Sequence, residues 1–147
     1  MKSIFVILFL FAIWAGSTLA GDKEDVQATV DKTIEAFNKQ DHQSYFSTFT
    51  DDNTAFPYVV SPLRHDAAMW KNFIEGTASL AYVNYHQQDE QVQVYNGNTA
   101  VVTGNFTFKW MEKGGQMNYQ SGRASMVLVK QDGKWMTAHM HFSEMFD

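Results

Sequence analysis

The sequence predicts an α+β domain in which N-terminal helices cover one face of a curved antiparallel sheet. Apolar residues recur at helical spacing between residues 24 and 76, whereas residues 80–144 form long segments of alternating character. Asn96-Gly97, Gly114-Gly115 and Asp132-Gly133 separate those segments, and each favours a tight hairpin because such turns need positive φ. Helices followed by a meander of strands are typical of a two-layer domain.

The first twenty residues have the composition of a secretory signal peptide. Lys2 gives a positive start, residues 4–15 are an unbroken apolar run, and Thr18 and Ala20 are small residues at positions −3 and −1 of a cleavage site. The run of twelve residues is shorter than the roughly 20 that span a bilayer. We therefore expect residues 1–20 to be removed, leaving residues 21–147 as one secreted or periplasmic domain without a membrane segment.

Composition narrows the classes of function. The chain has 11 Lys+Arg and 16 Asp+Glu, a net charge of −5, which disfavours binding to nucleic acid or to an anionic membrane. It has no cysteine, so disulfides, thiol nucleophiles and cysteine-ligated zinc sites are excluded. We expect neither a cofactor nor a metal, and a hydrophobic core alone must stabilise the domain.

Helix signals dominate the first half of the domain. A stripe of apolar residues at steps of four, four and three predicts a helix over residues 24–39: Val26, Val30, Ile34 and Phe37. The other elements expected here are a short helix over residues 43–49 capped by Asp41, a strand over residues 54–60, and a helix capped by Asp66 that ends at Gly76. Pro57 places the strand at an edge of the sheet or at a bulge.

Strands are expected over residues 80–95, 99–111, 116–130 and 135–144. In the second of these, the even positions from Ala100 to Trp110 are apolar and the odd ones mostly polar, so the even positions face the core. The same parity in the last strand places Met136, Ala138, Met140 and Phe142 inside. It places Trp135, Thr137, His139 and His141 on the outer face.

The last strand also carries a family resemblance. Asp132-Gly133-Lys134-Trp135 followed by His139-x-His141-x-Ser143 resembles the closing strand of the nuclear transport factor 2-like superfamily, especially its SnoaL-like members and the association domain of calcium/calmodulin-dependent kinase II. The resemblance extends to the order of elements and to two further segments, Gly97-Asn98-Thr99-Ala100 and Gly122-Arg123-Ala124-Ser125. The resemblance implies a cone-shaped sheet wrapped around the helices. It does not choose a function, because isomerases, dehydratases, cyclases, transport factors and oligomerisation hubs share this fold.

Two departures from that family bear on the site. The ketosteroid isomerase branch has a catalytic aspartate before a proline on its first strand, where this chain has Phe56-Pro57. The kinase hub has inward-facing arginines, and the positions that match them here are Phe106, Met126 and Phe142. The resemblance therefore implies a dry, aromatic pocket that has neither the catalytic aspartate nor the inward-facing arginines.

The residues expected to line this pocket are largely aromatic. They are Tyr45, Phe56, Tyr58, Trp70, Tyr82, His86, Phe106, Phe108, Trp110, Met126, Met140 and Phe142. The same side chains could instead simply fill the core. If the even positions of residues 80–88 face inward, His86 is the best candidate for a general acid or base, with Tyr82 or Tyr45 beside it; otherwise His86 belongs to a solvated polar run.

The outer face of the sheet is expected to form a homodimer interface. His139 and His141 point the same way on one strand and could suit a metal, but the parity groups them with Trp135 rather than with further ligands. Arg123 has the same outward parity. An apolar, aromatic face of this kind favours a symmetric contact between two copies.

Three classes of function remain open. The first is an exported binding or accessory domain with an apolar small-molecule pocket. The second is a small acid–base enzyme that acts on a hydrophobic substrate. The third is an oligomeric scaffold whose cone is filled by its own side chains, and an open cavity would distinguish the first two from it.

Overall fold

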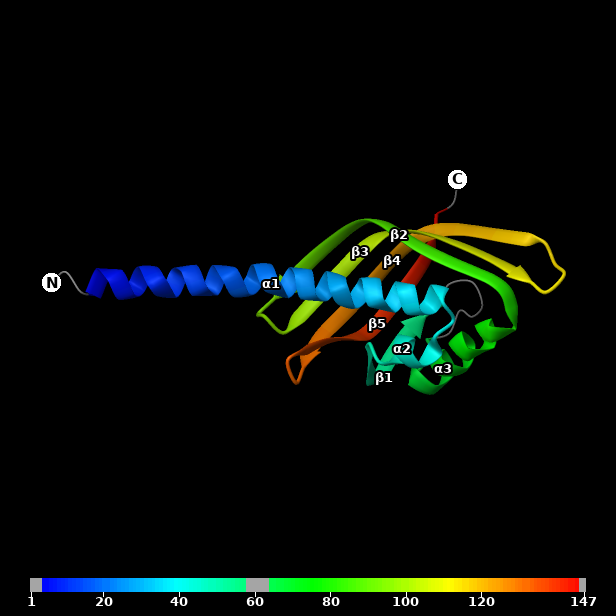
Figure 1. The fold of residues 1–147 in the computed structure, drawn as a ribbon, viewed down its shortest axis with the longest axis horizontal. Helices are drawn as coiled ribbons and strands as arrows, with labels where there is room; N and C mark the ends of the chain where they lie inside the picture. Colours follow the sequence, from blue (N-terminus) through cyan, green and yellow to red (C-terminus); the bar gives the residue numbers. More distant parts are fainter. Residues whose placement is uncertain (1–3, 58–63, 146–147) are drawn as a thin grey trace.

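The computed structural model describes residues 4–57 and 64–145, with side chains from residue 21 onward (Figure 1). Its elements are α1 (Ile4–Asn38), α2 (His42–Phe46), β1 (Phe49–Phe56), α3 (Ala67–Gly76), a 3-10 turn (Thr77–Ser79), β2 (Leu80–Tyr95), β3 (Thr99–Glu112), β4 (Met117–Gln131) and β5 (Lys134–Glu144). The five strands form one unclosed sheet in the order β1-β5-β4-β3-β2. β1 pairs in parallel with β5, and the other pairs are antiparallel. The α+β class is confirmed.

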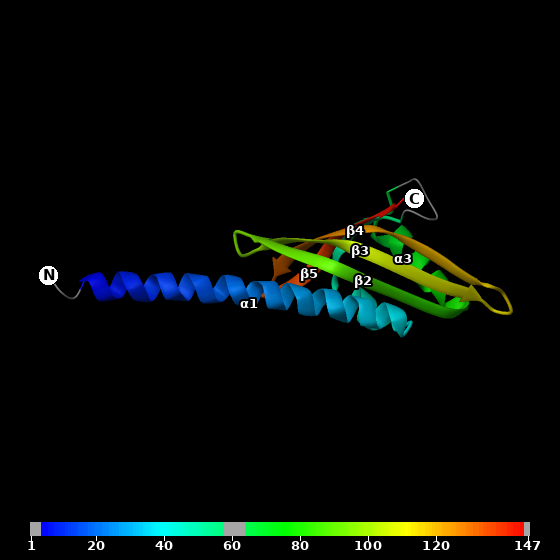
Figure 2. The same cartoon turned by 90° about the horizontal axis from the view of Figure 1, so that it is seen from above.

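The helices cover one face of the curved sheet (Figures 1 and 2). α1 packs on β2 and β5, and α3 packs on β1. α1 is longer than the helix expected over residues 24–39, and no proline separates that segment from the apolar run before it. The N-terminal part of α1 extends away from the sheet in Figure 1. Among the described residues, no helix combines the length and the apolar character needed to cross a membrane.

Local signals in the sequence determine where several elements begin and end. The Asp41 carboxylate accepts a hydrogen bond from the Ser44 backbone N–H at 3.0 Å, and that of Asp66 accepts one from Met69 at 2.9 Å, so both predicted N-caps are confirmed. The predicted hairpins are confirmed as well. Their turn residues with positive φ are Asn96, Gly97, Gly114, Asp132 and Gly133.

The core lies between α1 and the inner face of β3 and β4. Val26 and Val30 of α1 are fully buried, as are Ala100, Val102 and Leu128 on the strands that face them. The inward parity expected for residues 99–111 is thus confirmed. At the start of this contact, the Asp22 carboxylate pairs with Lys130 at 2.5 Å, which ties α1 to β4.

A bulge in β5 reverses the predicted parity of its first residues. Val127 pairs with His139 but Leu128 pairs with Thr137, which leaves Ala138 as the extra residue. A one-residue shift moves side chains to the opposite face. Trp135 and Thr137 are therefore buried in the core, with Trp135 only 4% exposed, and the prediction of an outward-facing Trp135 is wrong. After the bulge the prediction holds, because Met140 is buried while His141 is exposed.

The buried position of Trp135 predicts a large effect on stability. Trp135→Ala should lower the free energy of unfolding by about 3–5 kcal/mol, because it removes a large side chain from a packed core. His141→Ala, six residues away on the exposed face, should change it by less than about 0.5 kcal/mol. Urea unfolding of both variants measures the difference. Equally small effects of the two substitutions would indicate that Trp135 lies on the outer face.

Candidate binding cavity

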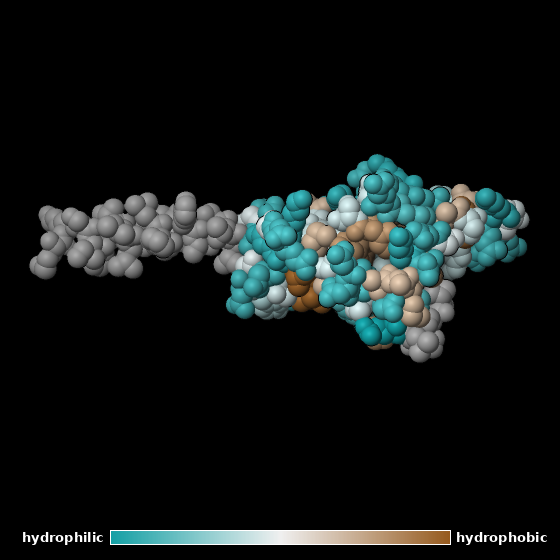
Figure 3. Space-filling model, turned by 90° about the horizontal axis from the view of Figure 1, so that it is seen from below, coloured by the Kyte–Doolittle hydropathy of each residue, from teal (hydrophilic) through white to brown (hydrophobic). Residues whose placement is uncertain are grey.

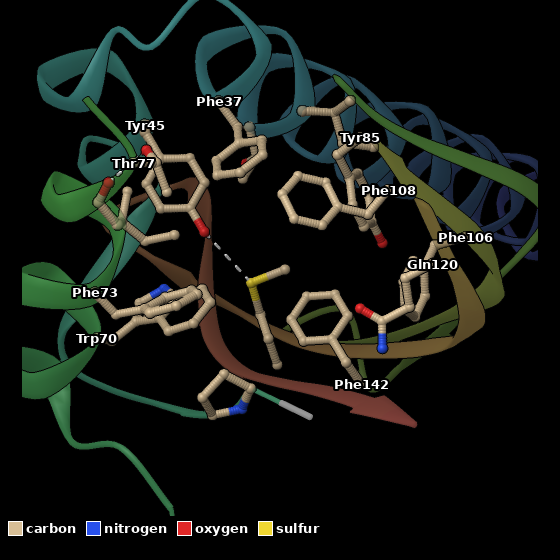
Figure 4. A pocket seen from close by; sticks show the side chains of 15 residues that line it. Phe37, Tyr45, Trp70, Phe73, Thr77, Tyr85, Phe106, Phe108, Gln120 and Phe142 are labelled. Atoms are coloured by element: carbon tan, nitrogen blue, oxygen red, sulfur yellow. Dashed lines mark hydrogen bonds between the residues drawn. The ribbon is translucent and has the colours of Figure 1, made fainter. Parts of the chain in front are cut away.

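An apolar cavity of about 100 Å³ lies between the helices and the inner face of the sheet (Figure 4). Every layer of the fold contributes to its wall. The lining residues are Thr33, Ile34, Phe37, Tyr45, Pro57, Trp70, Phe73, Ile74, Thr77, Tyr85, Phe106, Phe108, Gln120, Met140 and Phe142. On the outside, the face seen in Figure 3 is largely hydrophilic, with apolar side chains gathered in a recess near its middle.

Contacts between aromatic rings hold the wall in place. On the sheet side, Tyr85 stacks on Phe106 with ring centres 5.5 Å apart, and Phe106 meets the edge of Phe142 at 5.6 Å. On the helix side, Trp70 stacks on Phe73 at 5.2 Å. Trp70 and Phe142 are 6.5 Å apart and join the two sides. Each ring is thus fixed by others, which limits collapse of the wall into the cavity.

Gly122 determines where the Phe106 ring lies. The two residues are opposite each other on β4 and β3. A Cβ at position 122 would come within 2.7 Å of the Phe106 ring and 2.1 Å of the Ser143 carbonyl oxygen. Glycine is therefore required here by the close approach of a ring and a neighbouring strand, rather than by its φ.

The ionisable groups of the described wall are two tyrosines, and both are held neutral. Burial raises the pKa of Tyr45 above its ordinary value, and the Tyr45 hydroxyl donates to the Met140 sulfur at 3.8 Å. Burial also raises the pKa of Tyr85, with smaller contributions from Tyr45 and Glu90. The Tyr85 hydroxyl donates to the Gln87 side-chain oxygen at 2.9 Å. At neutral pH neither phenol can accept a proton as a base.

Gln120 is the polar residue of the wall whose oxygen has no partner. It is 8% exposed, and its Oε1 accepts no hydrogen bond from the described residues. The two threonines of the wall differ, because Thr33 donates to the Thr29 carbonyl oxygen at 2.8 Å and Thr77 donates to that of Ile74 at 2.6 Å. The side chain of Trp70 interacts with the Tyr45 hydroxyl, which opposes the rise in the pKa of Tyr45, and Trp70 Nε1 lies on the side of the indole that faces away from Gln120 in Figure 4.

The structure brings together half of the pocket residues expected from the sequence. Six of them line the cavity: Tyr45, Trp70, Phe106, Phe108, Met140 and Phe142. Trp110 stacks on Phe108 at 4.9 Å without reaching the cavity, and Met126 is buried in the core. Tyr58 lies outside the described residues.

The expectation that Tyr82 and His86 face inward is wrong. On this part of β2 the buried positions are the odd ones, Val83 and Gln87, so the even ones point outward. Tyr82 is 41% exposed, and the exposed His86 borders a separate surface groove between α1 and β2. The sequence signal was present, because Val83 is the apolar residue of this stretch and it shares parity with Tyr85.

Phe56 also lies outside the cavity. It is 37% exposed, and its ring contacts those of His139 and His141 at 5.8 and 5.5 Å on the outer face. The next residue, Pro57, lines the cavity instead. The edge position of Pro57 was expected, but the direction of its neighbour depends on the pairing of β1 with β5.

The outer face carries the remaining candidates. His139 Nδ1 is hydrogen-bonded to the Thr54 hydroxyl at 2.7 Å, and burial, with the charges of His141 and Arg64, lowers the pKa of His139. Arg123 is exposed on the same face. Within residues 4–57 and 64–145, no three histidine, aspartate or glutamate side chains gather as a metal site would require.

Sequence comparison decides the family. A sequence model described as a SnoaL-like domain matches residues 26–147. The chain belongs to the SnoaL-like domain family. The resemblance noted in the last strand is therefore confirmed, and the matched segment begins close to Asp22, whose ion pair with Lys130 joins α1 to β4. No curated protein matches the sequence.

Solved structures confirm the nuclear transport factor 2-like fold. A proposed calcium/calmodulin-dependent protein kinase II association domain from Xanthomonas campestris is 23% identical with a TM-score of 0.72, over 82% of this chain and 85% of that one. A proposed scytalone dehydratase from Novosphingobium aromaticivorans is 11% identical with a TM-score of 0.80, over 89% of both chains. A nuclear transport factor 2-like protein from Salmonella enterica is 17% identical with a TM-score of 0.77, over 88% of this chain and 94% of that one. At these identities the likeness concerns the fold alone.

Proposed function

We propose that this SnoaL-like domain binds a small apolar molecule in the cavity of about 100 Å³. The observation that carries the proposal is a wall of mutually packed rings that borders free space and, among the described residues, has no charged side chain. Apolar cavities of this kind stay dry, and one of about 150 Å³ is known to accept benzene. The size of the cavity favours a ligand with a single ring.

The expected affinity follows from the buried area. Burying about 150 Å² of apolar ring surface gives about 4 kcal/mol, which corresponds to a dissociation constant near 1 mM. Further contacts in the wall would tighten binding. The buried area by itself therefore supports a weak site.

The wall favours binding over the two other classes of function. An acid–base enzyme needs a group that accepts a proton beside its substrate, and Tyr45 and Tyr85 are held protonated by burial. His86, the candidate base, lies outside the cavity. A scaffold without a ligand would be expected to fill its cone, whereas here the rings leave a space.

The cavity should bind toluene, and filling it should abolish the binding. NMR titration of the purified protein should show saturable shifts for resonances of the wall. Phe142→Trp enlarges a wall residue and should weaken binding at least tenfold, because the larger ring takes up space that the ligand needs. Phe46→Trp makes the same change beside Tyr45 but outside the wall, and it should leave binding unchanged. A wild-type protein that shows no saturable shifts would contradict the proposal.

We also propose that the chain is exported after removal of residues 1–20. The support is the signal-like sequence, the start of the family match at residue 26, and the extension of this part of α1 away from the sheet. Ala20 lies directly before the expected cleavage site.

Exported protein should begin at Gly21. Ala20→Arg should block processing, because the −1 position of a signal peptide needs a small residue, whereas Ala28→Arg should be processed normally. N-terminal sequencing of the exported material measures both. Finding Met1 at the start of the exported wild-type chain would rule cleavage out.

We further propose a homodimer through the outer face of the sheet. Helices cover the inner face, whereas Val101, Val127 and Val129 are partly exposed on the outer one, next to Phe56 and His139. Such an apolar patch is typical of an interface. The burial of Trp135 removes one residue from the expected interface but leaves this patch intact.

Light scattering at micromolar concentration and neutral pH should give twice the mass of the chain. Val127→Asp should yield a monomer, while Ala28→Asp on the exposed side of α1 should not. Because the pKa of His139 is lowered, its charging and the resulting repulsion should appear only below about pH 6.5, the ordinary histidine pKa. A monomeric wild-type protein at neutral pH would refute the dimer.

A further inference from the structure

We propose that the cavity selects a hydrocarbon ring and excludes the same ring when it carries a hydroxyl, amine or carboxyl group. This inference rests on the proposed binding function and specifies its class of ligand. The selection acts by exclusion, because every part of the described wall that faces the free space is apolar, although several lining residues carry polar side-chain atoms.

The threonine hydroxyls of the wall are already bonded to the backbone. Thr33 donates to the Thr29 carbonyl oxygen at 2.8 Å, one turn earlier on α1. Thr77 donates to the Ile74 carbonyl oxygen at 2.6 Å, in the last turn of α3. Because the accessible wall is apolar, these two residues contribute only carbon atoms to it.

The two phenolic hydroxyls are also used within the protein. The Tyr85 hydroxyl donates to the Gln87 side-chain oxygen at 2.9 Å. The Tyr45 hydroxyl donates to the Met140 sulfur at 3.8 Å, drawn as a dashed line from Tyr45 in Figure 4, and both residues are buried. A thioether accepts this bond weakly and is otherwise an apolar group. Met140 therefore bonds the Tyr45 hydroxyl without presenting a polar group to the cavity.

Two further polar atoms lie beneath the surface of the wall. Gln120 Oε1 and Trp70 Nε1 have almost no accessible surface. Figure 4 shows the Gln120 side chain next to those of Phe106 and Phe142, and the side chain of Trp70 interacts with the Tyr45 hydroxyl. A hydroxyl group that entered the cavity would therefore find no hydrogen-bond partner among the described residues.

A polar substituent on the ligand would lose its hydration on entry and gain nothing in return. The same loss separates transfer of a hydroxyl from water into cyclohexane from transfer into octanol, because only octanol can replace the bond to water. A charged group would lose more, since the described wall has no charged side chain to pair with it. The cavity should thus behave as an alkane phase of about 100 Å³, which suits a single hydrocarbon ring.

Toluene and phenol test the inference, because the two rings have nearly the same shape and differ in a methyl or a hydroxyl group. NMR titration of the purified protein measures both dissociation constants. Phenol should bind at least about a hundredfold more weakly than toluene. The ratio of the two constants should match the relative partition of the two rings between water and cyclohexane, measured in the same buffer, rather than that between water and octanol.

A polar group placed in the wall should relax the exclusion. Met140→Gln keeps the length of the side chain but puts an amide where the sulfur lies, so it should lower the ratio of the phenol constant to the toluene constant at least about tenfold. Met69→Gln makes the same change at an exposed position of α3 and should leave the ratio unchanged. Phe142→Tyr provides a second polar variant of the wall should Met140→Gln not fold.

The outcomes separate the selectivity from the binding function. If both rings bind and phenol binds within about tenfold of toluene, or if the ratio is the same in wild type and in the folded polar variant, the exclusion is refuted while the binding function stands. If neither ring binds to the wild-type protein, the binding function fails, and the inference fails with it.

Discussion

The bulge at Ala138 is the constraint on which the inner face of this domain depends. β5 lies between β1 and β4, so a change of register there affects both neighbours. Before the bulge, Trp135 and Thr137 fill the core under α1; after it, Met140 and Phe142 reach the cavity. Without the extra residue, one of these pairs would face solvent. One inserted residue thus lets a single strand supply two regions of the interior that lie on different sides of its pleat.

A second shift of register, between Gln88 and Gln91, acts in the same way on β2, which is an edge strand of the sheet. Asp89 has a φ of 56° within this shift. Before it, Val83 and Tyr85 point inward; after it, Val92 and Val94 pack against the core. The two strands with a shifted register, β2 and β5, lie on either side of β3 and β4. β3 and β4 pair without a shift, so inward and outward side chains alternate regularly at the centre of the sheet.

The cavity exists because contacts with one another hold its rings in place and leave the space between them unfilled. Tyr85, Phe106 and Phe142 are held by mutual contacts on the sheet, and Gly122 leaves room for the Phe106 ring at the centre of this group. Trp70 and Phe73 are held separately on α3, which the Asp66 cap starts. The sheet and α3 therefore position two separate groups of rings in the wall. The same packing keeps the cavity dry. Burial in this wall keeps Tyr45 and Tyr85 neutral. The Oε1 atom of Gln120 is unusual because it has no hydrogen-bond partner among the described residues.

The sequence by itself determined the order of the elements, the helix caps at Asp41 and Asp66, the three hairpins and the inward face of β3. These features depend on residues close to one another in the chain: a carboxylate three residues from a free N–H, a turn that needs positive φ, an alternation of period two. It also supplied the aromatic character of the pocket and six of its residues.

Only the tertiary structure decided that Trp135 is buried, that Phe56 points outward, and that Tyr85 and Gln120 complete the wall. Tyr85 and Gln120 enter the wall because both pair with Phe108 across the sheet, whereas the directions of Trp135 and Phe56 depend on where a strand gains one residue relative to its partner. That position is selected by the pairing of strands far apart in the chain, and the residues on either side of a bulge carry no local pattern that marks it.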